Sequence, residues 1–86
     1  MIQIIKFSAD WCAPCKMLKP IWDNLTKTIN DVDFIPVNVD NDPKMASMFK
    51  IQAIPTLIFI KDGSEVTRIT GLVKEAEIVK VIDSLR

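Results

Sequence analysis

"IQIIKFSADWCAPCKM", residues 2–17, contains the first two elements expected of this chain and its only two cysteines among 86 residues. Residues 2–8 are rich in β-branched and aromatic side chains and almost continuously apolar, which is typical of a buried, parallel strand. From Cys12 to about Ile29, apolar residues recur at steps of three and four, as on one face of a helix. The segment therefore predicts a strand followed directly by a helix, with both cysteines at the junction.

The rest of the chain predicts five further elements in sequence. We expect a strand at 33–40, a short helix at 41–49 with Asp42 as its cap, a hairpin at 54–70 with Asp62 and Gly63 at its turn, and a final helix at 74–85. Strands joined through a helix run parallel, whereas the strands of a hairpin run antiparallel. The order β-α-β-α-β-β-α thus predicts an α/β fold with a four-stranded mixed sheet and three helices. Because 86 residues leave no room for a second core, we expect one domain over 1–86.

Two details of these elements are open to direct test. Pro36 lies inside a predicted strand, and because proline has no N–H to donate, it favours an edge position or a bulge. The methionines of the helical segments are expected to fill gaps in the core. They are Met17, Met45 and Met48.

Composition narrows the possible partners. The chain is 49% hydrophobic and carries 11 basic and 11 acidic side chains, so its formal net charge is zero. A neutral chain gives no electrostatic reason to expect binding to nucleic acid or to an anionic membrane. Its apolar runs are far shorter than the ~20 residues that cross a bilayer. The N-terminal residues show no secretory signal pattern, so we expect a cytoplasmic protein.

The spacing of the two cysteines suits redox chemistry better than stabilisation of the fold by a disulfide. A disulfide that closes a three-residue step adds little stability through loop entropy. On a helix, positions i and i+3 lie on one side, which suits the ~5.5 Å between Cα atoms of an unstrained disulfide. Free N–H groups and the helix dipole at a helix N-terminus favour a thiolate at Cys12, which attacks disulfides, and Cys15 can then resolve the mixed disulfide. The spacing predicts a reversible two-electron switch.

Other uses of a cysteine pair fit this chain less well. Cysteines are often small buried side chains without chemistry, and a CxxC pair can be half of a zinc site. The chain has no histidine and no second cysteine pair, so it cannot complete a tetrahedron of thiols and imidazoles by itself. Haem attachment requires a histidine where Lys16 stands. We therefore expect no metal and no cofactor.

The residues around the cysteines resemble those of the thioredoxin family. "WCAPCK" (11–16) followed by Pro20 is similar to the active-site helix of that family, whose usual form is WCGPCK with a proline five residues after the second cysteine. "AIPT" (53–56) is similar to the family segment whose Ile–Pro bond is cis and faces the cysteines. Further matches in order and spacing are "NVDNDP" (38–43), "KDG" (61–63) and Gly71.

The resemblance covers nearly the whole chain and implies a thioredoxin-like fold and a thiol–disulfide oxidoreductase that reduces protein disulfides. It implies that Cys12 is the nucleophile and Cys15 the resolving thiol. It also implies an electron carrier without a cofactor, acting as a monomer on disulfide-containing proteins and recharged by a thioredoxin reductase or a similar donor. The implied substrate-docking residues are Trp11, Ala13, Pro14, Ala53, Ile54, Pro55, Gly71 and Leu72, with the backbone of Ile54 pairing with an extended substrate segment. For Trp11, Ile54 and Leu72, ordinary core packing is the alternative.

The sequence departs from the family pattern in two ways. Family members usually have another strand and helix before the strand that leads to the cysteines, so we expect a short thioredoxin with four strands. The family's buried carboxylate, six residues before the first cysteine, is Lys6 here, and its usual lysine partner is Pro36. We hypothesise that Lys6 lies behind the cysteines and favours thiolate, which would make the protein a weaker reductant. The alternative is that its ammonium group reaches solvent and leaves the cysteines unaffected.

Three rival functions remain open at the level of sequence. A glutaredoxin-like enzyme that uses glutathione fits the size, although its usual proline–aromatic pair between the cysteines does not match "CAPC". A binding module with incidental redox activity is a second rival. The third is an oxidant of thiols in an extracytoplasmic space.

Overall fold

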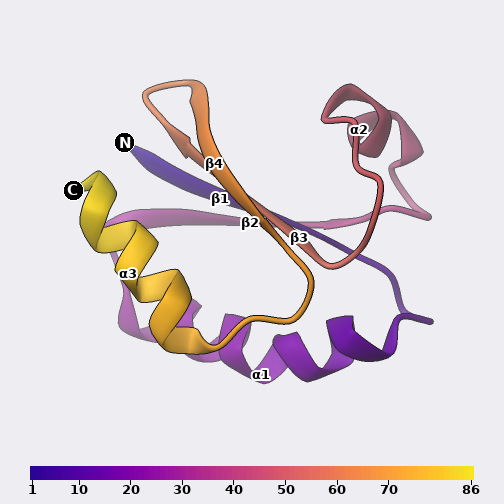
Figure 1. The fold of residues 1–86 in the computed structure, drawn as a ribbon, viewed down its shortest axis with the longest axis horizontal. Coiled ribbons are helices and arrows are strands. Elements are labelled where there is room, and N and C mark those ends of the chain that lie inside the picture. The colour runs from indigo at the N-terminus through magenta and orange to yellow at the C-terminus, as the bar shows by residue number, and fades with distance from the viewer.

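The computed structural model describes residues 1–86 throughout, and its elements follow the predicted order (Figure 1). The predicted helix from Cys12 begins one residue later, and the predicted strand at 33–40 is shifted slightly toward the N-terminus. The elements are β1 (Ile2–Ser8), α1 (Ala13–Thr28), β2 (Val32–Asn38), α2 (Pro43–Met48), β3 (Thr56–Lys61), β4 (Ser64–Thr70) and α3 (Glu75–Leu85).

The four strands form one mixed sheet in the order β2-β1-β3-β4. β1 pairs in parallel with β2 and antiparallel with β3, and β3 pairs antiparallel with β4. The expectation that strands joined through a helix are parallel therefore holds for β1 and β2 but is wrong for β2 and β3, which α2 joins.

β2 is an edge strand, and Pro36 pairs in register with Lys6 of β1. The edge position predicted from Pro36 is confirmed. At an edge, the missing N–H of a proline can face away from the sheet, where no strand needs it.

Helices cover both faces of the sheet: α1 and α3 lie against one face and α2 against the other (Figure 1). Side chains of β1 alternate between the two, so that Ile2 and Ile4 pack with α1 and α3 while Ile5 and Phe7 pack on the α2 side. Burial on both faces explains why β1 is almost continuously apolar instead of alternating with polar residues.

α1 carries the apolar face that its spacing predicts. Leu18, Trp22 and Leu25 are buried against the sheet, and the ring of Trp22 meets Phe34 edge-on at 5.2 Å between centroids. The helix continues through Pro20 to Thr28, and the N–H of the C-cap residue Ile29 donates to the carbonyl of Leu25. None of the three helices is both long enough and apolar enough to span a bilayer.

The predicted cap of α2 and the predicted turn of the hairpin are also confirmed. Asp42 caps α2 by accepting a hydrogen bond from the N–H of Met45 at 3.1 Å. The β3–β4 hairpin turns at Asp62 and Gly63, whose φ angles of 52° and 86° lie in the left-handed region used by tight hairpin turns. The exposed Asp62 carboxylate also accepts a hydrogen bond from the Met1 ammonium group.

The prediction that the helix methionines fill the core is wrong for two of three. The side chains of Met17 and Met48 are 63% and 70% exposed, because both lie on the outer sides of their helices. Met45 is partly buried and packs against the cluster on the α2 side of the sheet. Helical spacing placed these residues in helices but did not identify the face on which each lies.

This difference in burial gives a test of the core beneath the cysteines. Leu18→Ala should lower the free energy of unfolding by about 2–5 kcal/mol, because it removes a fully buried side chain and leaves a cavity. Met17→Ala, its neighbour on the exposed side of α1, should change it by less than about 0.5 kcal/mol. Urea denaturation of the oxidised proteins measures both, and equal losses would contradict the assigned faces of α1.

Candidate active site

The two cysteines meet where β1 gives way to α1, and they form a disulfide with 5.2 Å between their Cα atoms. Both are largely buried, with 5% and 6% of Cys12 and Cys15 exposed. Together with Ala9 they form a small apolar cluster, against which Val39 and Ile54 pack. The predicted proximity of the two cysteines is confirmed.

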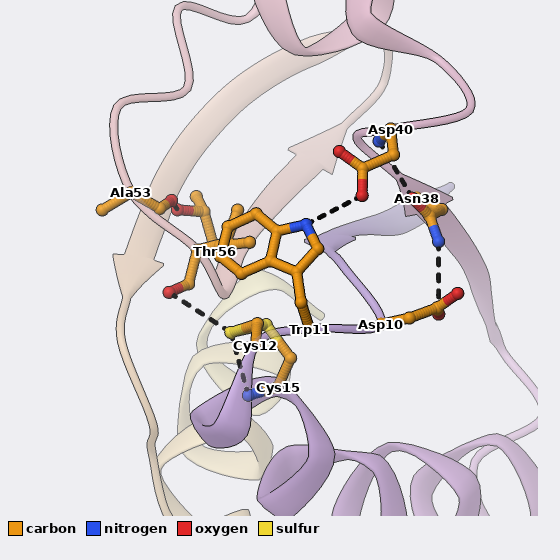
Figure 2. The surroundings of a disulfide bond; sticks show 9 residues. Asp10, Trp11, Cys12, Cys15, Asn38, Asp40, Ala53 and Thr56 are labelled. Carbon is orange, nitrogen blue, oxygen red and sulfur yellow. Dashed lines mark hydrogen bonds between the residues drawn. A yellow bond between two sulfur atoms is a disulfide. The ribbon is translucent and has the colours of Figure 1, made fainter.

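The two sulfur atoms have different surroundings (Figure 2). Cys12 is the N-cap of α1, and the N–H of Cys15 donates to Cys12 Sγ at 3.3 Å. The carbonyl oxygen of Ile54 lies 3.9 Å from the same sulfur. A helix N-terminus and a donated N–H both stabilise negative charge, so this arrangement favours a thiolate at Cys12 when the disulfide is reduced.

A second loop faces the disulfide from across the site. The Ile54–Pro55 peptide bond is cis, as the resemblance implies. The Pro55 carbonyl accepts a hydrogen bond from the N–H of Gly71 at 2.8 Å, and the Thr56 hydroxyl donates to the Ala53 carbonyl at 2.6 Å. These two bonds fix the loop that leads into β3 and connect it to the residue that follows β4.

Trp11 lies on the surface beside the disulfide, not in the core. Its side chain is 69% exposed, and the indole Nε1–H donates to the carboxylate of Asp40 at 2.8 Å. The N–H of Asp40 donates to the side-chain oxygen of Asn38, and the amide nitrogen of Asn38 donates to Asp10 (Figure 2). This chain of polar contacts holds the indole across the surface. The role of Asp40 was not predicted, although the residue lies in the "NVDNDP" segment that resembles the family.

A mainly apolar groove of about 340 Å³ runs from Trp11 toward α2. Its lining includes three of the predicted docking residues and four that were not predicted. The lining residues are Trp11, Val39, Ala46, Ile51, Gln52, Ala53 and Ile54.

The other predicted docking residues lie outside the lining of this groove. Ala13 and Pro14 are exposed at the start of α1, and Gly71 donates a hydrogen bond to the carbonyl of Pro55. Pro55 itself is fully buried, so its predicted place on the docking surface is wrong. Leu72 is 46% exposed, so core packing does not explain it, whereas Ile54 packs against buried clusters and lines the groove as well. The predicted surface is thus split between a groove and its border.

Lys6 lies under α1, close to the cysteines. Only 8% of the residue is exposed, and its Nζ lies 5.0 Å from the centre of the Trp22 ring. Lys6 and Cys15 line one cavity, and the Lys6 ammonium group, which has no hydrogen-bond partner in the protein, stays accessible to water while the rest of the side chain is buried. Burial lowers the pKa of Lys6 below its ordinary value of 10.5; the carboxylate of Asp23 opposes this shift and Lys19 adds to it.

The chain offers no evident metal site, because no three histidine, cysteine, aspartate or glutamate side chains come together around one point.

Comparison with known proteins identifies the family. The family model described as Thioredoxin matches residues 1–84. This chain belongs to the thioredoxin family. Its Cys12–Cys15 pair is the redox-active disulfide of a CxxC active site, and the protein is a thiol–disulfide oxidoreductase.

Related thioredoxins occur in plants and in bacteria. Thioredoxin H2 of Arabidopsis thaliana is 40% identical over 85 residues, covering 99% of this chain and 63% of the plant protein. A thioredoxin of Chlamydia trachomatis is 40% identical over 81 residues, covering 94% of this chain and 79% of the bacterial one. This chain therefore spans under two thirds of the plant protein and about four fifths of the chlamydial protein.

Solved thioredoxin structures share the fold. The thioredoxin of Fasciola hepatica has a TM-score of 0.92 at 35% identity and covers 99% of this chain and 81% of its own. A mutant thioredoxin of Halobacterium salinarum has a TM-score of 0.91 at 32% identity, with 98% and 74% covered. A third structure has a TM-score of 0.90 at 33% identity and covers 98% of this chain and 78% of its own. It comes from a study of the thiol-resolving mechanism in a yeast mitochondrial 1-Cys peroxiredoxin via glutathione and thioredoxin systems.

The partial desolvation of Lys6 makes the stability of the protein depend on pH. Between the lowered pKa of Lys6 and 10.5, the unfolded chain binds more protons at this group than the folded one, so the group adds stability as pH rises. Lys6→Met should therefore be more stable than wild type at neutral pH, with an advantage that shrinks as pH rises toward 10.5.

Urea denaturation of the oxidised proteins between about pH 7 and pH 10 measures this difference. Lys80→Met, at an exposed position of α3, is the control for the loss of one positive charge. An advantage of Lys6→Met that stays constant or grows with pH would contradict the burial of the charged group.

Proposed function

We propose that this thioredoxin-family protein is a reductant of protein disulfides. The Cys12 thiolate attacks one sulfur of the target disulfide and forms a mixed disulfide, while the other target sulfur leaves as a thiolate. Cys15, as a thiolate, then attacks Cys12 Sγ, which forms the Cys12–Cys15 bond and releases the second target thiolate. Two electrons pass to the target, which takes up two protons. The observation that carries this proposal is the Cys15 N–H donated to Cys12 Sγ at the start of α1.

The groove and the Ile54 backbone support an extended, partly apolar substrate segment. The N–H of Ile54 donates no hydrogen bond within the protein and its carbonyl contacts only Cys12 Sγ, so this backbone can pair with a substrate strand. Trp11 and Ala53 flank this backbone and line the groove, where an apolar side chain near the target cysteine would lie. Ala13, Pro14 and Gly71 would form the border that the target protein contacts, while the buried Pro55 would shape the loop beneath it.

The partners follow from the redox cycle. The oxidised protein needs an electron donor, for which we propose a flavin-dependent thioredoxin reductase or a similar enzyme. A dithiol that must be kept reduced suits a compartment where thiols are kept reduced, which favours the cytoplasm.

We propose a monomer as the active form, because a second copy on the groove would block the substrate. The peroxiredoxin of the related yeast study makes peroxidase disulfides one class of target to test.

The two cysteines should fail in different ways when replaced. Cys12→Ser should lower the rate of insulin-disulfide reduction by about a thousandfold or more, to background, because no nucleophile remains. Cys15→Ser should still attack but accumulate a mixed disulfide with the target, since nothing resolves it. Turbidity measures the first effect and non-reducing electrophoresis the second. Mixed disulfides that accumulate on Cys15 in Cys12→Ser would reverse the assigned roles.

Two further tests separate the rival functions. A binding module would keep its biological effect when both cysteines are serine, whereas a reductant would lose it. A glutaredoxin-like enzyme would turn over with glutathione and glutathione reductase, which we expect to be slow here beside turnover with a thioredoxin reductase.

We further propose that Lys6 modulates the cysteines. Its position on the cavity that Cys15 also lines places a positive charge behind the disulfide while the ammonium is protonated. A nearby positive charge favours the thiolate over the thiol and so stabilises the reduced form, which would make the protein a weaker reductant.

Removing this charge should raise the pKa of the nucleophile. Lys6→Met should raise the Cys12 pKa by about 0.5–1 unit, because a cation near the site is lost while the length of the side chain is nearly kept. Thiolate absorbance of the reduced proteins measures the titration, with Lys80→Met as the control for net charge. An unchanged or lower Cys12 pKa in Lys6→Met would show that Lys6 does not act on the thiolate.

A further inference from the structure

A second cavity beside the disulfide carries chemistry that the redox cycle does not use. It measures about 340 Å³ and shares no lining residue with the apolar groove. Most of the residues that line it are polar or charged, unlike those of the groove. The lining residues are Lys6, Ser8, Ala9, Asp10, Cys15, Lys16 and Lys19.

The positive charges of this cavity are only partly balanced by the protein. Lys19 forms an ion pair with Asp23 at 2.7 Å, but neither Lys6 nor Lys16 forms an ion pair with any carboxylate. Asp10 also lines the cavity, and it accepts a hydrogen bond from Asn38 without pairing with a lysine. Two unpaired ammonium groups therefore border one space together with a single carboxylate.

Lys6 makes this an organised site instead of a patch of mobile lysines. The residue is more than nine-tenths buried beneath α1, and the face of the Trp22 ring lies 5.0 Å from Nζ. No protein oxygen accepts a hydrogen bond from this ammonium group, and no polar side-chain atom of the chain is both enclosed and unpartnered, so the donors of Lys6 are open to water. The cavity is the open space beside the group, so an acceptor would have to come from there.

We propose that this cavity is a binding site for a small oxyanion, a phosphate or a carboxylate, held by the ammonium groups of Lys6 and Lys16. Either anion supplies oxygen acceptors to both groups, and charge-assisted hydrogen bonds of this kind are among the stronger ones in proteins. The volume of the cavity exceeds that of either group, so water molecules would fill the remainder.

The site is coupled to the redox state because Cys15 forms part of its lining. The disulfide is uncharged, whereas the reduced pair carries a thiolate at Cys12, next to the Cys15 side chain that lines the cavity. An anion should therefore bind the oxidised protein more tightly than the reduced one, and by reciprocity it should make the reduction potential more negative. A tenfold difference in affinity corresponds to about 30 mV.

The test uses inorganic phosphate as the probe and requires no substrate. Phosphate is titrated into the oxidised, isotopically labelled protein at constant ionic strength, and backbone and lysine side-chain NMR signals are followed. We expect saturable shifts centred on Ser8, Ala9 and Lys16, with affinity about tenfold weaker in Lys6→Met. Lys16→Met is a second variant at an exposed position, where folding is not at risk, and Lys80→Met should bind as wild type does.

Acetate, titrated in the same way, identifies the source of the anion. Saturation by phosphate assigns a free inorganic anion, whereas saturation by acetate alone assigns a carboxylate, such as an acidic side chain of a partner. Failure of both to saturate, or affinities that Lys6→Met and Lys16→Met leave unchanged, would overturn the site.

The reduction potential of the wild type, measured with and without saturating phosphate, or with acetate where only acetate binds, tests the coupling. A more negative potential supports it, and an unchanged or more positive one refutes it. Insulin reduction by the same samples reports the proposed function separately, so either idea can fail without the other.

Discussion

The N–H of Cys15, donated to the sulfur of Cys12, is the interaction on which the site depends. It exists because Cys12 stands at the cap of α1, where backbone N–H groups have no partners within the helix. The cap is held in place by β1, a strand buried on both faces that ends at Ser8, four residues before the cysteine. The reactivity of one sulfur therefore rests on the burial of a strand that never touches a substrate.

Most of the fold could be predicted because its signals are local. The apolar run of β1, the Asp42 cap and the Asp62–Gly63 turn each depend on neighbours in sequence, and each was found where expected. The methionines show the limit of such signals. Met17 follows directly on the active-site residues of α1 yet faces solvent, because the sheet touches only one side of that helix. A residue's face depends on what packs against its helix, which local sequence does not state.

The residues of the site likewise divide into those that local sequence indicates and those that only the fold brings together. The resemblance identified the cysteines and the cis Ile54–Pro55 bond, since both lie in short characteristic segments. The bond from Trp11 to Asp40 joins residues 29 apart and depends on how α1 and β2 are placed, so no local pattern indicates it. The contact of Lys6 with the Trp22 ring is equally invisible in the sequence, because it needs both β1 and α1 in position.

The register of the sheet clarifies why two family positions differ together here. Lys6 and Pro36 are direct neighbours across β1 and β2. Position 36 is exposed, but a lysine there would still put a second positive charge directly opposite Lys6, and like charges directly opposite each other in a sheet are destabilising. Proline carries no charge, and at the edge of the sheet it deprives no further strand of a hydrogen bond.

The two hydrogen bonds that fix the loop before β3 have a consequence for the speed of exchange with targets. With Gly71 bonded to Pro55 and Thr56 bonded to Ala53, the Ile54 backbone is already ordered before a partner arrives. Little conformational entropy is then lost on contact, so a brief, small interface suffices for the sulfur atoms to meet. An electron carrier has to dissociate from each target after a single exchange. A rigid loop helps, because it lets the target bind through few contacts, and few contacts are then broken on release.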